Sequence, residues 1–353
     1  MGTEGVQVRI GDRTLGDGNP AYLVFEAGAT HTGLASAKEL VRAAAKSGAD
    51  AIKFQTIFVD RLMSSQPVAV TYTTTTKSVQ EDLATILRRR QLTDPEWLEL
   101  ARYAREQGIT FFSTPDSPRS VDLLIEAGTP CIKIAGGDMN CLPLIRYAAE
   151  TRLPVLLDTR GTLGELERAV ETCLQAGNEQ IVIVYCPSGY PATVEGVRLR
   201  SIELLRRTFP FPIGFSDHSP GIHMNVAALA LGAHMIEKTI TLDRHQASIE
   251  HVMSIEPKEL EDFIVCLREV ERALSGDRWR MMPGEERDGL KKMRRSVTLT
   301  RDKAAGDIIT ADDITYKRPG FGIASEFAGL VVGRRLREAR PADSILAWED
   351  LAS

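Results

Sequence analysis

The chain has 353 residues and a mass of 38.8 kDa, and 43% of its residues are hydrophobic, so it is long enough for about two domains with large cores. Its 43 basic and 48 acidic residues give a formal net charge of −5. This charge provides no positive field for a polyanion and argues against general nucleic-acid binding.

No segment of the sequence indicates export or a membrane. Residues 1–20 lack a basic stretch followed by an apolar one, and no run of about 18 apolar residues occurs anywhere. The five cysteines are scattered and odd in number, so we expect reduced core residues and no zinc ribbon. We therefore expect a cytoplasmic protein that does not contact membranes.

Short apolar, β-branched segments alternate with amphipathic segments of helical period between residues 21 and 240. Several of the helical segments end on a glycine, as helix C-termini often do. Eight near-continuous apolar strands, each followed by a helix, predict a closed (β/α)8 TIM barrel, with an open doubly wound sheet as the alternative. The predicted strands are 21–28, 49–55, 109–114, 130–136, 154–159, 180–186, 211–217 and 233–240.

Three regions outside this repeat have their own patterns. Residues 6–16 alternate apolar and polar side chains around Gly-Asp, which predicts a hairpin that covers the bottom of the barrel. Residues 57–93, with the run TYTTTTKS, predict a polar loop that acts as a lid or contacts substrate. We expect a barrel domain in 1–275, a linker in 276–293 and a small β-rich domain in 294–353.

Polar side chains end the predicted strands, at the face where barrels carry their active sites. A single buried lysine is more often a paired structural charge, but three lysines that converge with Glu26 and Glu237 would hold an anion such as phosphate or carboxylate. The lysines are Lys53, Lys133 and Lys238. Other polar groups at these ends include Gln55, Thr114, Ser188 and Ser216.

Three of the six histidines are candidates for the site. His218 ends the seventh strand, where it could bind a divalent metal while Asp217 orients its ring. His31, in the first loop, could contact substrate or serve the turn. His251, after the eighth strand, could be a ligand or an acid, or a solvated loop residue.

Six segments surround these strand-end residues: Glu-Ala-Gly-Ala-Thr-His (26–31), Gly-Ala-Asp-Ala-Ile-Lys-Phe-Gln (48–55), Phe-Ser-Thr-Pro (112–115), Lys-Ile-Ala-Gly-Gly-Asp (133–138), Gly-Phe-Ser-Asp-His-Ser (214–219) and Ile-Glu-Lys-Thr-Ile-Thr-Leu-Asp (236–243). Taken in this order, they resemble the sialic acid synthase family, which includes N-acetylneuraminate, legionaminate and pseudaminate synthases and related spore-coat enzymes. The last sixty residues are similar to the family's antifreeze-like (SAF) domain, including Tyr-Lys-Arg-Pro-Gly at 316–320.

The resemblance implies a condensation of phosphoenolpyruvate with the open-chain aldehyde of an N-acylated hexosamine, with release of phosphate. It also implies a divalent metal, manganese or magnesium, that polarises the aldehyde oxygen, and a domain-swapped homodimer in which Arg318 reaches the partner's pocket. It assigns catalysis to Glu26, Lys53 and His218 and metal binding to His218, and we expect His251 as the second metal-binding residue. The expected substrate-binding residues are Gln55, Thr114, Lys133, Ser188, Tyr190, Ser216, Lys238, Arg318 and His31.

The chain departs from the family at several site positions. Thr239 stands where the family has a second metal-binding histidine, and a lone imidazole is a poor metal site. Gly136 replaces a serine, and Asp158-Thr159-Arg160 replaces Ser-Thr-Gly, so hydroxyls that bind the donor's phosphate are lost. Asp158 would repel phosphate unless Arg160 pairs with it. These changes predict an altered substrate or a metal site remodelled with His251, Glu237 or water.

Two other functions remain open at this stage. The barrel could be an aldolase or lyase in which Lys53, Lys133 or Lys238 forms a Schiff base. It could also be a sugar-acid binder without catalytic activity. The retained set of charged residues favours the synthase, because a decayed site has no reason to keep them together.

Overall fold

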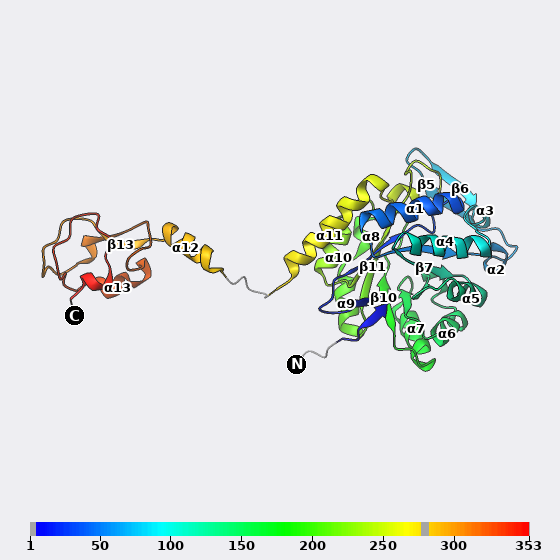
Figure 1. The fold of residues 1–353 in the computed structure, drawn as a ribbon, viewed down its shortest axis with the longest axis horizontal. Coiled ribbons are helices and arrows are strands. Elements are labelled where there is room, and N and C mark those ends of the chain that lie inside the picture. Colours follow the sequence, from blue (N-terminus) through cyan, green and yellow to red (C-terminus); the bar gives the residue numbers. More distant parts are fainter. Residues whose placement is uncertain (1–4, 277–281, 353) are drawn as a thin grey trace. The chain divides into compact units, whose positions relative to one another are not determined.

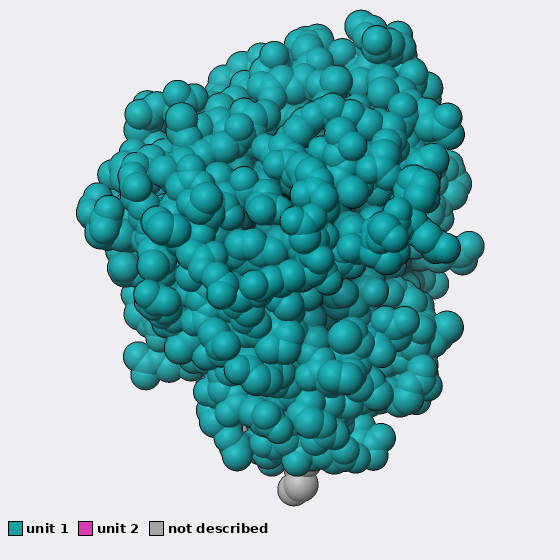
Figure 2. Space-filling model, turned by 90° about the vertical axis from the view of Figure 1, so that its right-hand side faces the viewer, with its two compact units in different colours: residues 1–275 teal, residues 276–353 magenta. Residues whose placement is uncertain are grey.

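The computed structural model describes residues 5–276 and 282–352. Contacts divide the chain into two units, Met1–Ser275 and Gly276–Ser353, and we treat each by itself. Figure 1 draws both units as a ribbon and labels many of their elements, and Figure 2 shows one face of unit 1 as a space-filling surface.

Eight parallel strands of unit 1 close into a barrel. The last strand pairs with the first, with Met235 opposite Tyr22 and Thr239 opposite Glu26. The closure confirms the predicted TIM barrel and rules out an open sheet, which would have two unpaired edges. The strands are β3 (Tyr22–Glu26), β4 (Ala51–Thr56), β7 (Thr110–Pro115), β8 (Ile132–Ile134), β9 (Val155–Asp158), β10 (Ile181–Tyr185), β11 (Ile213–Asp217) and β12 (Met235–Thr239).

Helices cover the outside of the barrel, and their apolar faces form one core with the outward side chains of the strands. Their starts follow the sequence: Thr93 and Glu96 form a capping box at the start of α4, and Thr162 and Glu165 form one at α7. The main helices are α1 (Leu34–Ser47), α4 (Asp94–Glu106), α5 (Pro118–Glu126), α6 (Leu142–Glu150), α7 (Leu163–Gln175), α9 (Arg200–Thr208), α10 (His223–Ala230) and α11 (Leu260–Leu274), and the four-residue α8 (Val194–Val197) precedes α9.

The predicted N-terminal hairpin forms and closes the amino end of the barrel. Strand β1 (Val8–Ile10) pairs antiparallel with β2 (Arg13–Leu15). The side chains of Val8, Ile10 and Leu15 are fully buried among the barrel's interior residues, which include Tyr22 and Ala51 at the first positions of β3 and β4. The hairpin therefore seals the end opposite the carboxyl ends of the strands.

The insertion at 57–93 is more ordered than the sequence predicts. It contains helix α2 (Val59–Leu62), an antiparallel hairpin of β5 (Ala69–Thr73) and β6 (Ser78–Asp82), and helix α3 (Leu83–Arg88). The prediction of a polar loop at 57–93 was wrong, because threonine, although polar, is β-branched and favours strands. The run TYTTTTKS supplies part of both strands and the turn between them.

Unit 2 has a small apolar core of its own, built around Val297, Ile309, Ile323 and Leu346. Its regular elements are α12 (Gly284–Met293), β13 (Ser296–Leu299), β14 (Ile314–Lys317) and α13 (Ala328–Val331). Part of the predicted linker 276–293 is thus helical, and residues 277–281 lie outside the described residues. The first turn of α12 carries acidic residues and its last turn carries lysines, and both interact favourably with the helix dipole. Polar composition alone does not reveal this arrangement.

Among residues 5–276 and 282–352, no helix combines the length and apolarity needed to cross a membrane.

The hairpin seal can be tested by truncating one buried side chain. Ile10→Ala is expected to lower the free energy of unfolding by about 2–5 kcal/mol, since it leaves a cavity among interior barrel residues. Arg9→Ala, on the exposed face of the same strand, should change it by less than about 0.5 kcal/mol. Urea unfolding of the full chain, followed by circular dichroism, measures both, and equal effects would contradict the seal.

Candidate active site

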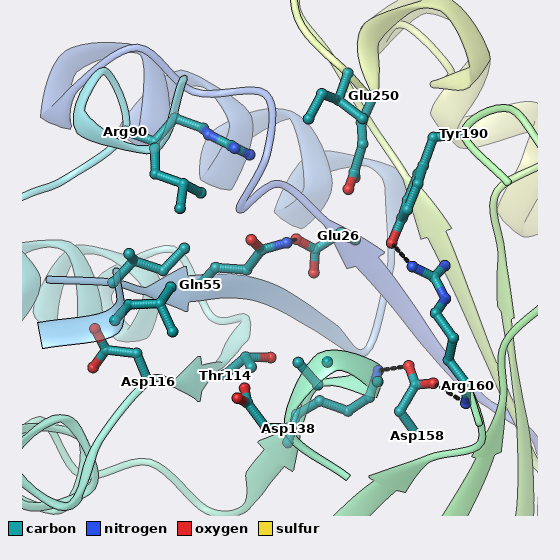
Figure 3. A pocket seen from close by; sticks show the side chains of 18 of the residues that line it. Glu26, Gln55, Arg90, Thr114, Asp116, Asp138, Asp158, Arg160, Tyr190 and Glu250 are labelled. Atoms are coloured by element: carbon teal, nitrogen blue, oxygen red, sulfur yellow. Dashed lines mark hydrogen bonds and ion pairs between the residues drawn. The ribbon is translucent and has the colours of Figure 1, made fainter. Parts of the chain in front are cut away.

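A cavity of about 700 Å³ lies at the carboxyl ends of the barrel strands. The insertion contributes Leu62, Val70, Leu87 and Arg90 to its wall, and the loop after β12 contributes Glu250. Figure 3 shows side chains from these separate elements converging on one space. Eight of the site residues expected from the sequence lie on this wall: Glu26, Lys53, Gln55, Thr114, Lys133, Tyr190, Ser216 and His218.

The centre of the cavity is a buried cluster of opposite charges around Glu237. Its carboxylate lies 3.5 Å from Lys53 Nζ and 3.3 Å from Lys133 Nζ, and it accepts a hydrogen bond of 2.7 Å from Ser216 Oγ. Lys53 also forms an ion pair with Glu26. All four charged side chains are buried, so removing one would leave an uncompensated charge at a cost of about 3–5 kcal/mol.

The cluster keeps Lys53 and Glu237 ionised. Burial alone lowers the pKa of Lys53, but the charges of Glu237 and Glu26 outweigh burial and hold the pKa above its usual value. Burial alone raises the pKa of Glu237, but Lys133 and Lys53 outweigh it and hold that pKa well below its usual value. Both side chains therefore carry their charges at neutral pH.

The alternation of side chains along each strand decides which residues reach the cavity. On β12, Met235 lies in the barrel interior and Glu237 lines the cavity, so Lys238 between Glu237 and Thr239 points outward. Its Nζ lies 2.7 Å from Asp217 Oδ2 and also donates to the carbonyl of Ser219. The expectation that Lys238 binds substrate at the mouth is therefore not met, because the adjacent Glu237 occupies the inward position.

Arg160 lies beside Tyr190 and His218 at one end of the cavity. Its Nη1 donates to Tyr190 Oη at 2.6 Å, and its guanidinium carbon lies 4.5 Å from the centre of the Tyr190 ring. The rings of Tyr190 and His218 are 4.6 Å apart. Burial first, and then the charge of Arg160, lower the pKa of His218 well below its usual value. His218 is therefore neutral, and its Nδ1 is buried with no hydrogen-bond partner in the described part of the chain.

Arg90 and Glu250 also line the cavity, with Glu250 beside Tyr190, and Figure 3 shows both directed toward the space over Glu26. Burial, followed by the negative charge of Glu26, raises the pKa of Glu250 to about 7. Glu250 Oε2 is buried without a hydrogen-bond partner among the described residues. A carboxyl group that exchanges its proton near neutral pH is suited to acid–base chemistry.

Four more expected site residues lie off the wall. His31 is buried against the rings of Phe54 and Trp97, with centroid distances of 5.6 and 6.2 Å. Apolar packing explains its position, and burial lowers its pKa to about 4. His251 Nδ1 is 2.7 Å from Thr241 Oγ1, which holds its ring. Ser188 is exposed and does not line the cavity, and Arg318 is exposed in unit 2, so its contact with a partner remains a prediction.

The side chains around His218 do not fit a divalent metal. Thr239, in place of a second histidine, has its hydroxyl 3.5 Å from the carbonyl of Asp217, and His251 does not line the cavity. The carboxylate of Glu237 already forms ion pairs with Lys53 and Lys133 and accepts a hydrogen bond from Ser216. Within the ranges 5–276 and 282–352, no three His, Cys, Asp or Glu side chains are grouped so that they could hold a metal ion.

Sequence reasoning missed Arg90 and Glu250 as site residues, and for Arg90 a signal was present. Ile86 and Leu87 are buried on α3. Arg90 comes four residues after Ile86 and three after Leu87, and residues at these spacings lie on the same side of a helix. If the helical turn continues past Arg88, Arg90 therefore lies on the buried side. Arg88 and Arg89 point to solvent. No comparable signal exists for Glu250, because it lies in a loop.

Comparisons with known proteins identify relatives of both units. Residues 40–278 match the NeuB family and residues 294–352 match the SAF domain. The chain is 33% identical to N,N'-diacetyllegionaminic acid synthase of Legionella pneumophila, over 97% of each chain. It is 32% identical to human N-acetylneuraminate-9-phosphate synthase, over 86% of this chain and 85% of the relative.

A solved structure shows the same fold over most of the chain. The N-acetylneuraminic acid synthetase of Leptospira borgpetersenii serovar Hardjo-bovis, in complex with citrate, superposes with a TM-score of 0.70 at 28% identity. The match covers 81% of this chain and 95% of that one. With a barrel, a C-terminal SAF domain and relatives named as sugar-acid synthases, this chain belongs to the NeuB family.

Proposed function

We propose that the chain condenses phosphoenolpyruvate with the open-chain aldehyde of an aldose or an N-acylated hexosamine, giving a 2-keto-3-deoxy sugar acid and inorganic phosphate. The observation that carries the proposal is the buried cluster of Lys53 and Lys133 around Glu237 at the mouth of the barrel. Relatives named as legionaminic acid and N-acetylneuraminate-9-phosphate synthases support the reaction class.

The cations of the wall suit an anionic donor. Lys53, Lys133 and Arg90 all line the cavity and offer N–H donors to carboxylate and phosphate oxygens. Thr114 adds a hydroxyl on the same wall. A volume of about 700 Å³ lies within the range of small-molecule sites and has room for the donor together with a sugar.

The acidic part of the wall suits a polyhydroxylated acceptor. Asp116 and Asp138 lie near each other on the side away from Tyr190 (Figure 3). Burial, then the charge of Asp116, raises the pKa of Asp138. Carboxyl groups accept hydrogen bonds from sugar hydroxyls, so we assign this side of the cavity to the acceptor.

The reaction needs one proton delivered and one removed. Carbon 3 of the donor forms the new bond to the aldehyde carbon, and the aldehyde oxygen takes a proton. Water then adds at carbon 2 and loses one proton to a base. As the C–O bond breaks, phosphate leaves with its electrons and takes up the second proton of that water, and carbon 2 becomes a keto group. We assign the donated proton to Glu250, whose pKa is raised, and removal of the water's proton to Glu26, which Gly28 N–H and Gln55 Nε2 hold at 2.8 and 3.1 Å.

Two alternatives have less support. A Schiff base needs a lysine that is neutral and free, but Lys53 and Lys133 are ion-paired and Lys238 is outside the cavity wall. A binder without activity would not need Glu250, a buried carboxyl with a proton to exchange. The homodimer with a crossing Arg318 and the cytoplasmic location remain predictions from the sequence.

The proposed reaction predicts release of phosphate only when donor and acceptor are both present. Lys133→Met should lower kcat/KM at least about 100-fold, since it removes a buried cation facing the donor. Lys38→Met, on the outer helix α1, should leave the rate unchanged. A phosphate assay with a panel of aldoses and N-acyl hexosamines measures this, and no release with any acceptor would refute the proposal.

The assignment of Glu250 predicts a specific pH dependence. Its carboxyl is protonated below a pKa of about 7, so kcat/KM should fall about tenfold per pH unit above that value. Glu250→Gln should lower the rate about 100-fold at pH 6.5 and remove this alkaline limb. Glu195→Gln, at an exposed site, serves as the control. An alkaline limb that persists in Glu250→Gln would show that another group provides the proton.

A further inference from the structure

We propose that Arg160 takes the place of a divalent metal beside His218, so that its guanidinium is the cation that binds and polarises the acceptor's carbonyl oxygen. The inference deepens the proposed function and rests on it. It starts from the mismatch between the metal that the family resemblance implies and the side chains that this chain places around His218.

Gly136 and Arg160 form one feature although they lie in different loops. A Cβ atom at Gly136 would come within 2.5 Å of Arg160 Cβ, 2.9 Å of Asp158 Oδ1 and 3.3 Å of Arg160 Cδ. Any side chain at position 136 would therefore displace Arg160. The absence of a side chain there makes room for the arginine, so these two departures from the family belong together.

The guanidinium is fixed in one position by its surroundings. The backbone N–H of Arg160 donates to Asp158 Oδ1 at 2.8 Å, and its Nη2 donates to the carbonyl of Pro187 at 3.3 Å. The guanidinium lies over the Tyr190 ring, and its Nη1 donates to the Tyr190 hydroxyl. Arg160 Nε is buried and has no partner among the described residues. Arg160 lines the cavity, so its fixed positive charge can attract an oxygen of the ligand without rearrangement.

The same arginine makes the His218 end unsuitable for a second cation. Tyr190 contacts both Arg160 and His218, so the permanent charge of Arg160 lies close to the imidazole. A divalent ion there would be repelled by Arg160 and would find one imidazole and no second histidine. The fixed positive charge of Arg160 thus takes the place of a bound divalent metal ion.

Manganese binding tests the inference independently of turnover. Mn²⁺ is titrated into the chelator-treated full chain and free Mn²⁺ is followed by electron paramagnetic resonance. We expect no stoichiometric binding up to about 1 mM, which is weaker than a built metal site would give. One Mn²⁺ per chain, lost in His218→Ala, would overturn the inference even if the chain shows no turnover.

Phosphate release provides the second readout. Excess chelator should change the rate less than about twofold, while Arg160→Ala should lower it about 100-fold or more. Gly136→Ser should cause a similar loss because its side chain displaces Arg160, and Arg168→Ala, on the exposed side of α7, should have no effect. Thermal unfolding checks that each variant is folded. Full activity in folded Arg160→Ala, or abolition by chelator, would overturn the inference; absence of phosphate release by the unmodified chain would instead refute the proposed function.

Discussion

The site depends on one buried carboxylate, Glu237, which holds two lysines that come from different strands. Lys53 on β4 and Lys133 on β8 would repel each other in a low-dielectric interior, and Glu237 on β12 lies within 3.5 Å of both. Ser216 on β11 fixes the carboxylate further. Because these strands belong to a closed barrel, their ends keep a fixed separation, and the cations are presented to a ligand without further ordering.

The inward-facing side chains of the barrel stabilise the fold at one end and form the cavity at the other. At the amino end the interior is apolar, and the β1–β2 hairpin closes it with Val8, Ile10 and Leu15. At the carboxyl end the same inward faces carry charged side chains, which the insertion and the loop after β12 partly cover with Arg90 and Glu250. Covering the charges removes water, which strengthens every interaction in the cavity and raises the pKa of Glu250.

The fold could be predicted from the sequence because its eight strands are apolar on both faces and each has turn residues at its ends. Strand-end residues such as Glu26 and Lys133 could be placed at the mouth for the same reason. Lys238 and His31 could not, because whether a residue at a strand end or in the loop that follows points inward depends on register and on packing partners such as Asp217 and Trp97. The link between Gly136 and Arg160 depends on a distance between two loops that no local pattern contains.

The central claim is that Glu237 holds Lys53 and Lys133 in place to bind an anion, and a double-mutant cycle tests it most directly. Calorimetry would measure the affinity for phosphoenolpyruvate of the unmodified chain, Lys133→Met, Glu237→Gln and the double variant. Residues that act as one unit should show a coupling of about 0.5–3 kcal/mol between the two substitutions. Effects on affinity that simply add would contradict the account.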